Sequence, residues 1–353
     1  MTEQDTSVPQ VTPPSWRVFH ATGQEPAGEP PRLPEPPPWR VFAGSPLQPA
    51  PPDDAQATRR RLGVVQEGPQ LREEEIDAVN AALLLRRPLL ITGPPGVGKS
   101  TLAYLIAHEL ALGRVLPWSI VSRTTLRGGL YEYDAIGRAQ AIAAWRAGGD
   151  NGITAPAADA TGAPDLGDFV TLGPLGTALL AYGRPRVLLV DELDKSDIDL
   201  PNDLLHVLEN GSYDIPELVR SSVGEVSVFT DDPERRAVIE AGRVECAEFP
   251  VVVITSNGER EFPAAFRRRC LPLEMRPPSR EQLISIVVSH LRRRPEGITA
   301  LVDEFERRLH GGGTQSVDQL LNAVQLTTAD GFQAEADGRK LIEMLLRDLS
   351  KGR

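Results

Sequence analysis

The eight residues GPPGVGKS match the pattern G-x-x-x-x-G-K-[ST] at every fixed position. Glycines in such a loop let the backbone approach a polyphosphate closely, and backbone N–H groups then point at its negative charges. Lys99 is expected to reach the terminal phosphates, and the Ser100 hydroxyl is expected to ligate Mg²⁺. The predicted nucleotide-binding residues are Gly93, Pro94, Pro95, Gly96, Val97, Gly98, Lys99, Ser100 and Thr101.

Two acidic residues follow directly after the apolar run VLLV. Asp191 stands at the end of a predicted buried strand, where parallel-sheet enzymes place ligand-facing residues, so it is the expected protein ligand of Mg²⁺. Glu192 is placed to polarise a water for attack on a γ-phosphate. An acidic strand-to-helix turn is the alternative, which the phosphate loop disfavours. Asp194 and Lys195 are expected to be surface residues.

A third apolar run, VVVITSN, ends at Asn257. An uncharged amide at this strand tip is suited to orient the attacking water or to contact the γ-phosphate. A capping role in the turn is the alternative. Because the carboxyl ends of parallel strands meet at one edge of a sheet, we expect Asn257, Asp191 and the phosphate loop to lie together.

The stretch PAAFRRRCLPL contains three consecutive arginines, Arg267 to Arg269. It lies one short predicted helix after Asn257. They could form a basic patch for nucleic acid, a solvated helix end, or a group aimed at nucleotide phosphates. The position just after Asn257 makes the first reading the weakest. Arg267 is expected to be structural, and Arg268 is expected to make a phosphate contact or an inter-subunit ion pair.

Short apolar strands that alternate with helical patterns predict an α/β domain with a parallel sheet. Strands are expected at 88–92, at 186–195 with acids at its C-terminal end, and at 249–257, and a hairpin is expected within 225–246. Four amphipathic helical patterns follow Pro278 and predict a small helical domain. The nucleotide-binding domain is therefore expected at 58–277 and the helical domain at 278–353.

The first 57 residues differ in composition from the rest, because fourteen of the 32 prolines fall within residues 1–52. Proline removes backbone donors, so we expect a disordered, partly polyproline II tail over 1–57. The tetrapeptide WRVF occurs twice in it, at Trp16–Phe19 and Trp39–Phe42. The two copies either fold back onto the protein's own surface or form a bivalent docking motif for a partner.

The overall composition narrows the class of function. A net charge of -11 argues against a broad electrostatic grip on nucleic acid. Cys246 and Cys270 show no metal-ligand spacing, which suits a reducing cytosol. No apolar run approaches the roughly 20 residues that a membrane span requires, and the N-terminus has no signal-peptide pattern. The expectation is a cytoplasmic protein without a membrane segment.

Together, the phosphate loop, the strand ending in Asp-Glu, the strand ending in Ser-Asn and the arginine cluster resemble the AAA+ ATPases, and more closely their MoxR type. The stretches GPLGTALLAYGRPRVLLVDELDK, PNDLLHVLENGSYDIPE and VVVITSNGEREFPAAFRRRCLPLE carry the resemblance, which runs from about residue 60 to 350. It implies a P-loop fold with a five-stranded parallel sheet between helices and a helical lid. It also implies a helix-2 insert, assigned to 123–140, and a pre-sensor hairpin, assigned to 225–246.

The resemblance assigns roles to single residues of this sequence. Walker A falls on Gly93, Gly98, Lys99 and Ser100. Walker B falls on Asp191 and Glu192, sensor 1 on Asn257, and the arginine finger on Arg269. Such a finger completes the active site of a neighbouring subunit, so the resemblance implies a ring, with a hexamer as the expected size.

By the same resemblance, the activity is Mg²⁺-dependent ATP hydrolysis that remodels a protein partner. A von Willebrand A domain protein is the expected partner, supplied as a separate chain. The family's sensor 2 arginine is missing, since the corresponding lid stretch reads GGTQSVDQLLNA, with Ser316, Val317 and Asp318. Either another group substitutes or the site works without it. A nucleotide-gated scaffold with low turnover and a nucleic-acid motor or loader stay as alternatives.

Overall fold

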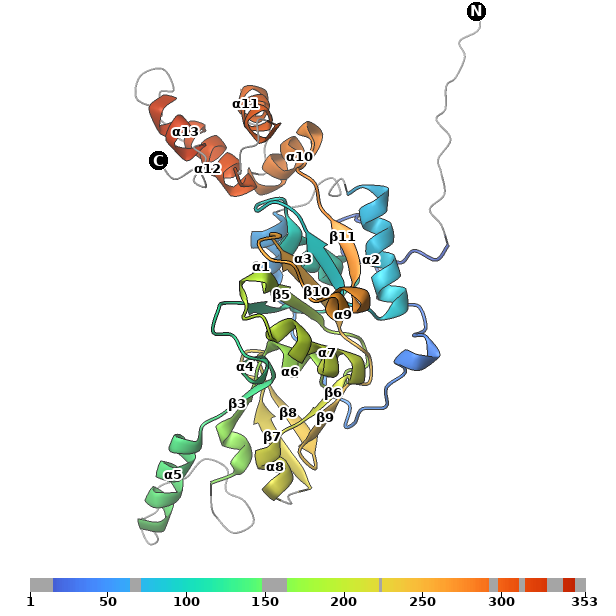
Figure 1. Ribbon diagram of the computed structural model, residues 1–353, viewed down its shortest axis with the longest axis vertical. Helices are drawn as coiled ribbons and strands as arrows, with labels where there is room; N and C mark the ends of the chain where they lie inside the picture. Colours follow the sequence, from blue (N-terminus) through green and yellow to red (C-terminus); the bar gives the residue numbers. More distant parts are fainter. Residues whose placement is uncertain are drawn as a thin grey trace, which may run out of the picture.

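A computed structural model of the 353-residue chain describes residues 15–63, 71–147, 164–221, 224–291, 298–310, 315–328 and 339–346. Two sheets and three hydrophobic clusters organise these residues. The order along the long axis in Figure 1 is a helical domain, then the central five-stranded sheet, then the second sheet.

The central sheet has five strands, all parallel, in the order β11-β1-β10-β5-β2. The strands β1 and β5 are short and almost wholly buried, as the apolar runs predict. The parallel five-stranded sheet expected from the sequence is therefore confirmed. Its members are β1 (Leu89–Thr92), β2 (Leu116–Ser119), β5 (Val187–Asp191), β10 (Val251–Ser256) and β11 (Leu271–Glu274).

Each face of this sheet has its own hydrophobic cluster, because successive side chains of a strand point to opposite faces. In β5, Leu189 packs on one face with α2 (Glu73–Leu85) and α3 (Lys99–Glu109). Its neighbour Val190 packs on the other face with α6 (Pro174–Ala178) and α7 (Leu200–Asn210). The sheet is thus covered by helices on both sides, the arrangement expected for an α/β domain (Figure 1).

Five further helices complete the described part of this domain. The first, α1, spans the position at which the N-terminal tail was expected to end. Helix α7 is ended by Gly211, which lies in the left-handed region at φ 61°. The helices are α1 (Ala55–Leu62), α6 (Pro174–Ala178), α7 (Leu200–Asn210), α8 (Pro216–Ser221) and α9 (Ala264–Arg269). Three 3₁₀ turns are η1 (Pro38–Arg40), η2 (Leu166–Phe169) and η3 (Leu193–Lys195).

A second, six-stranded sheet with the order β3-β4-β7-β8-β9-β6 lies beyond this domain. The expected hairpin is present as the antiparallel pair β7 and β8, with Val226 opposite Ile239. The stretch assigned to a helix-2 insert, 123–140, contains α4 (Leu126–Leu130), β3 and the start of α5 (Ala135–Ala147). The strands are β3 (Tyr131–Tyr133), β4 (Val170–Leu172), β6 (Ser212–Asp214), β7 (Glu225–Phe229), β8 (Arg236–Glu240) and β9 (Arg243–Glu245).

The described residues from Arg280 onward include four helices, which form a C-terminal unit with a core of its own around residues such as Phe305 and Leu320. They are α10 (Arg280–Leu291), α11 (Ile298–His310), α12 (Val317–Thr327) and α13 (Arg339–Leu345). These match the four amphipathic patterns of the sequence. Over the described ranges, no helix combines the length and apolarity that a bilayer crossing demands.

The first WRVF copy is anchored to the α/β domain by polar contacts. Phe19 is 0% exposed, and Asn80 of α2 accepts hydrogen bonds from the N–H groups of Val18 (2.8 Å) and Phe19 (3.0 Å). The Asn80 amide also donates to the Phe19 carbonyl at 2.7 Å. The Glu109 carboxylate accepts from the N–H groups of His20 and Thr22 at 2.5 and 2.7 Å.

The second WRVF copy lies against α7 and the chain just before β10. The Phe42 ring stacks on Phe249 at 5.8 Å, and the Arg40 guanidinium lies over the same ring at 4.6 Å. The expected disorder is therefore wrong for residues 15–57, and both copies fold back onto the protein's own surface. Backbone N–H groups of this segment donate to the side chains of Asn80 and Glu109, which lie far away in the sequence. The composition of the segment alone does not predict these hydrogen bonds. Residues 1–14 lie outside the described part.

A buried ion pair joins the second sheet to the base of the central one. Arg186, just before β5, has a side chain that is 0% exposed and donates to both carboxylate oxygens of Asp232, at 2.7 and 2.9 Å. Asp232 lies in the turn between β7 and β8 and also contacts Arg114 at 3.2 Å. The hairpin tip is therefore held in a fixed place beneath the nucleotide-binding sheet.

We predict that Phe19→Ala lowers the free energy of unfolding by about 3–5 kcal/mol, because a fully buried ring is removed from the core. Trp39→Ala is the control, since this side chain of the same segment is 77% exposed and should change stability by about 0.5 kcal/mol or less. Urea unfolding followed by circular dichroism measures both. Equal losses for the two variants would show that the segment is not packed.

Asp232→Ala should cost about 3–5 kcal/mol, because it leaves the buried Arg186 charge without its partner. The neighbouring Asp231 also contacts Arg114, but its side chain is 23% exposed. Asp231→Ala should therefore cost only about 1 kcal/mol or less. Thermal or urea unfolding of the two variants compares them, and the reverse order would contradict the role given to the buried pair.

Candidate functional site

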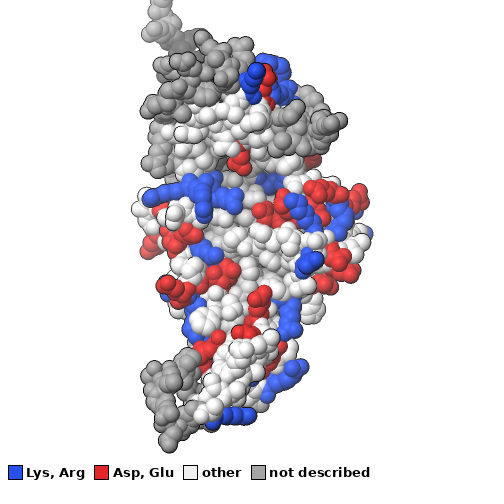
Figure 2. Space-filling model, turned by 90° about the vertical axis from the view of Figure 1, so that its left-hand side faces the viewer, with Lys and Arg blue, Asp and Glu red and all other residues white. Residues whose placement is uncertain are grey.

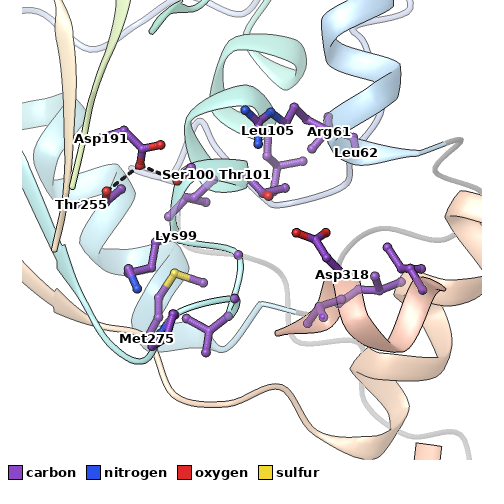
Figure 3. A pocket seen from close by; sticks show the side chains of 18 of the residues that line it. Arg61, Leu62, Lys99, Ser100, Thr101, Leu105, Asp191, Thr255, Met275 and Asp318 are labelled. Carbon is purple, nitrogen blue, oxygen red and sulfur yellow. Dashed lines mark hydrogen bonds between the residues drawn. The ribbon is translucent and has the colours of Figure 1, made fainter. Parts of the chain in front are cut away.

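A pocket of about 340 Å³ lies between the carboxyl ends of the central strands and the helical unit. Figure 3 shows its phosphate-loop side, with Lys99 and Ser100, facing Asp318 of α12 across the pocket. All three strand-end predictions converge here, because Asp191, Glu192 and Asn257 line the same pocket as the loop. Of the predicted loop residues, those that line it are Pro95, Gly96, Val97, Gly98, Lys99, Ser100 and Thr101.

The phosphate loop needs glycine for two separate reasons. Gly98 has φ 94° at the start of α3, a conformation that other residues rarely adopt. Gly96 has φ 77° and also lies against the helical unit, since an added Cβ would stand 2.5 Å from the Ser316 Cα. The loop is therefore shaped by both its own turn and its contact with the start of α12.

Lys99 is directed at oxygen acceptors around the loop. Its Nζ donates to the carbonyls of Gly93 and Pro94 at 2.7 Å each and to Asn257 Oδ1 at 2.8 Å. Burial lowers the pKa of Lys99, while the nearby carboxylates of Asp194, Asp191 and Glu192 act in the opposite direction. A partly desolvated ammonium among oxygen atoms is suited to bind phosphate oxygens.

Asp191 at the end of β5 accepts two hydroxyl hydrogen bonds. Its Oδ1 atom lies 2.6 Å from Ser100 Oγ and 2.7 Å from Thr255 Oγ1, as Figure 3 shows. Sequence reasoning placed the first two residues together but missed Thr255. The signal was present in the side-chain alternation of β10, because Thr255 and Asn257 both lie at its carboxyl end.

Glu192 is held in an uncommon backbone conformation, with φ 61°. Its N–H group donates to Thr255 Oγ1 at 2.8 Å, and its two carboxylate oxygens accept from Asn257 Nδ2 at 3.2 Å and Lys195 Nζ at 2.7 Å. The hydrogen bond to Glu192 raises the pKa of Lys195. The carboxylate is thus held by Asn257, at the end of β10, and by Lys195 of η3.

Asp194 is not the surface residue that the sequence suggested. It is 5% exposed, and its Oδ2 atom accepts from the N–H groups of Asn257 at 2.9 Å and Glu259 at 3.1 Å. A buried carboxylate that accepts two backbone N–H groups fixes the turn after β10. Asp194 therefore sets the position of the Asn257 side chain. Lys195 is half-exposed as expected, but it pairs with Glu192.

The predicted finger residues lie elsewhere. Arg268 and Arg269 occupy the last turn of α9, and neither lines the pocket. Arg269 pairs with Glu209 of α7 instead. The structure therefore does not bring the arginine cluster to the nucleotide pocket of its own subunit.

The far side of the pocket is largely apolar and comes from three parts of the chain. Leu62 is the last residue of α1, Met275 follows β11, and Ile286 lies on α10. Arg61, also in the lining, has its guanidinium 5.5 Å from the Tyr104 ring. An apolar slot beside a phosphate loop suits the flat base of a nucleotide whose phosphates lie in the loop. The sequence analysis predicted none of these apolar residues as nucleotide contacts.

Asp318, from the stretch where a sensor 2 arginine is expected, points into this pocket from α12 (Figure 3). Val317 and Leu321 of the same helix also line it. An acidic side chain here repels phosphate, so this lid helix supplies no positive group of the expected kind at that position. Within the described residues, no cluster of three or more His, Cys, Asp or Glu side chains could hold a metal.

A phosphate loop between a buried strand and a helix, with carboxylate and amide groups at the next strand ends, defines a P-loop nucleotide-binding protein. The family "AAA domain (dynein-related subfamily)" matches residues 88–270, more than half of the chain. The chain therefore belongs to this AAA domain family.

Two solved structures give weaker likenesses. NtrX from Brucella abortus in complex with ADP is 14% identical, with a TM-score of 0.33, and the match covers 71% of this chain and 48% of NtrX. A RuvB mutant from Thermotoga maritima is 15% identical, with a TM-score of 0.38, and the match covers 78% of this chain and 64% of RuvB. The chain thus spans less than two thirds of either protein. No curated protein sequence matches it.

We predict that Thr255→Val lowers the ATPase rate roughly tenfold or more, because Asp191 and the Glu192 N–H group both lose their hydroxyl partner. Thr255→Ser keeps the hydroxyl and should stay within about twofold of the wild type. Steady-state phosphate release at saturating ATP measures both variants. A valine variant as active as the serine variant would remove Thr255 from the site.

Proposed function

We propose that the chain is a MoxR-type AAA+ ATPase that assembles into a ring, with a hexamer as the expected size, and uses ATP hydrolysis to remodel a protein partner in the cytoplasm. The observation that carries the proposal is that the predicted arginine finger lies apart from the pocket that holds the other predicted catalytic residues. The pocket holds the loop, the acids and the amide, while the exposed Arg269 lies outside it on α9.

The residues in the pocket fit a magnesium–nucleotide substrate. The hydroxyl of Ser100 and the carboxylate of Asp191 are adjacent oxygen donors, the kind that Mg²⁺ takes together with substrate phosphates. Bound Mg²⁺ would neutralise charge on the phosphates. Lys99 would bind the terminal phosphates, and Glu192 Oε1, held by Asn257, would accept a proton from the attacking water.

The phosphate side of this pocket has no arginine of its own among the described residues. Arg61 lines the pocket, but it lies over the Tyr104 ring near the apolar side. An arginine that stabilises charge on the γ-phosphoryl group is worth roughly 10³–10⁵ in rate where it has been measured. We assign this role to Arg269 of a neighbouring subunit, with Arg268 as a second contact across the same interface. Head-to-tail contacts of this kind close into a ring.

A protein is favoured over nucleic acid as the partner. The net charge is -11, and Figure 2 shows one compact group of basic side chains on a face that otherwise carries acidic and basic side chains side by side. Nucleic-acid binding would require a continuous basic surface. A separate von Willebrand A domain protein is the partner class that the MoxR type suggests.

A scaffold that assembles with nucleotide but turns over slowly is the second candidate. Asp318 favours it, because this carboxylate occupies the lid position where an arginine would assist hydrolysis. The two candidates differ in turnover. The remodelling ATPase must hydrolyse ATP faster with its partner, whereas the scaffold must not.

We predict that Glu192→Gln and Arg269→Ala each bind ATP but lose most hydrolysis when assayed alone. Mixing the two variants should restore part of the activity, because a complete Arg269 in one subunit can serve the intact Glu192 site of the next. ATPase rate against mixing ratio measures this, with nucleotide affinity determined for each variant by fluorescence titration.

Normal hydrolysis by Arg269→Ala would contradict the finger assignment, and absence of recovery on mixing would contradict a shared site. Stimulation of the wild type by double-stranded DNA would favour the nucleic-acid alternative. ATP-dependent assembly without turnover, with or without an added von Willebrand A domain protein, would favour the scaffold.

A further inference from the structure

The helix that carries the finger residue is short, and another arginine holds its end. Helix α9 has six residues. Arg87, in the turn before β1, donates from Nε to the Arg269 carbonyl at 3.1 Å and from Nη2 to the Cys270 carbonyl at 3.4 Å, and it also contacts the Arg268 carbonyl. These bonds satisfy carbonyls that a helix leaves open at its C-terminus, so the backbone of α9 is fixed at Arg269.

The Arg269 side chain is held within its own subunit as well. Its Nε atom donates to the carboxylate of Glu209 in the last turn of α7, and its Nη1 atom donates to the Ala265 carbonyl at 3.2 Å. Within the described part of the chain, Nη2 makes no hydrogen bond. The guanidinium is therefore held through Nε and Nη1, and Nη2 stays available for a partner outside the described residues.

Glu209 depends in turn on the second WRVF copy. Arg40 Nη1 donates to the carbonyls of Leu208 at 2.9 Å and Glu209 at 3.2 Å, which belong to the C-terminal turn of α7. The Arg40 guanidinium also lies over the Phe249 ring. Figure 1 shows η1, the turn that contains Arg40, on the same side of the molecule as α7 and α9. The N-terminal segment thus clamps the helix end that presents Glu209.

We propose that Glu209 and Arg40 are positioning residues for Arg269. Glu209 orients the guanidinium, and Arg40 fixes the helix end that carries Glu209, so the N-terminal segment helps to set where the finger reaches. The inference rests on the proposed function, because it requires Arg269 to act on the site of a neighbouring subunit. An arginine side chain is flexible, and holding it in advance reduces the entropy lost when it engages phosphate.

The first WRVF copy supplies a matched control for the second. Arg17 has the same place in the tetrapeptide as Arg40, but it pairs with Glu73 and Asp77 on α2. Neither partner belongs to α7 or α9. Removing Arg17 therefore tests loss of a clamp from the N-terminal segment without touching the finger.

The experiment compares Glu209→Ala, Arg40→Ala, Arg17→Ala and Arg269→Ala in the full-length chain. We expect Glu209→Ala and Arg40→Ala to lower ATP turnover roughly two- to tenfold, the range for ordering one long side chain. Arg17→Ala should keep wild-type turnover. Nucleotide affinity, measured by titration with a fluorescent ATP analogue, should stay unchanged in all four variants, since none of these residues lines the pocket.

Mixing distinguishes a finger defect from general damage. Each of the two positioning variants is mixed with Glu192→Gln subunits, which carry an intact Glu209 and Arg269. Recovery of turnover in the mixture is expected, because the intact finger then serves the variant's own pocket. A variant that is merely misfolded would not recover and would bind nucleotide poorly.

Four results would overturn the inference. If Glu209→Ala hydrolyses ATP at the wild-type rate while Arg269→Ala is defective, Arg269 acts as the finger but Glu209 does not position it. Faster turnover by Glu209→Ala would mean that Glu209 restrains the finger. An equal loss in Arg17→Ala and Arg40→Ala would remove the specific link to the second copy. Normal turnover by Arg269→Ala would remove the finger itself, and this inference with it.

Discussion

The Asp191 carboxylate is the point on which the arrangement of the site depends. One of its oxygens accepts hydroxyls from Ser100, on the helix after the phosphate loop, and Thr255, near the end of the neighbouring strand. The same Thr255 hydroxyl accepts the N–H group of Glu192. A single short network therefore fixes the relative positions of the loop and two strand ends. The apolar strands behind it can be packed tightly because their polar groups all emerge at this edge.

The N-terminal segment shows how a proline-rich stretch can be ordered without joining a sheet. Its backbone groups bond to the side chains of Asn80 and Glu109, which lie on α2 and α3. The two WRVF copies use equivalent residues in the same way, because in each the arginine binds the protein surface and the phenylalanine packs against it. The tryptophans, Trp16 and Trp39, are the more exposed members at 42% and 77%.

Much of the central domain could be predicted from the sequence, because apolar strands and a phosphate loop are local patterns. The positions of Lys99, Asp191, Glu192 and Asn257 around one pocket follow from parallel strand ends alone. The burial of Asp194 could not be predicted, because its partners are backbone N–H groups 63 and 65 residues away.

Other features were beyond local patterns for similar reasons. The second sheet takes its strands from four separate parts of the chain. Three of these parts supply only one strand of three residues each, β3, β4 and β6. These strands are too short to show a clear alternation of apolar and polar residues. The order of residues 15–57 depends on acceptors supplied by distant helices. The partner of Arg269 is a surface glutamate on another helix, which spacing along the chain does not indicate.

The contact between Gly96 and Ser316 gives the helical unit a direct mechanical link to the phosphate loop. A Cβ at Gly96 would stand 2.5 Å from the Ser316 Cα, so glycine is what allows the loop to lie this close to the start of α12. A sensor arginine would report the nucleotide through charge, which dissolved ions screen. Steric contact is not screened in this way. Transmission from loop to lid in this protein should therefore be nearly independent of ionic strength.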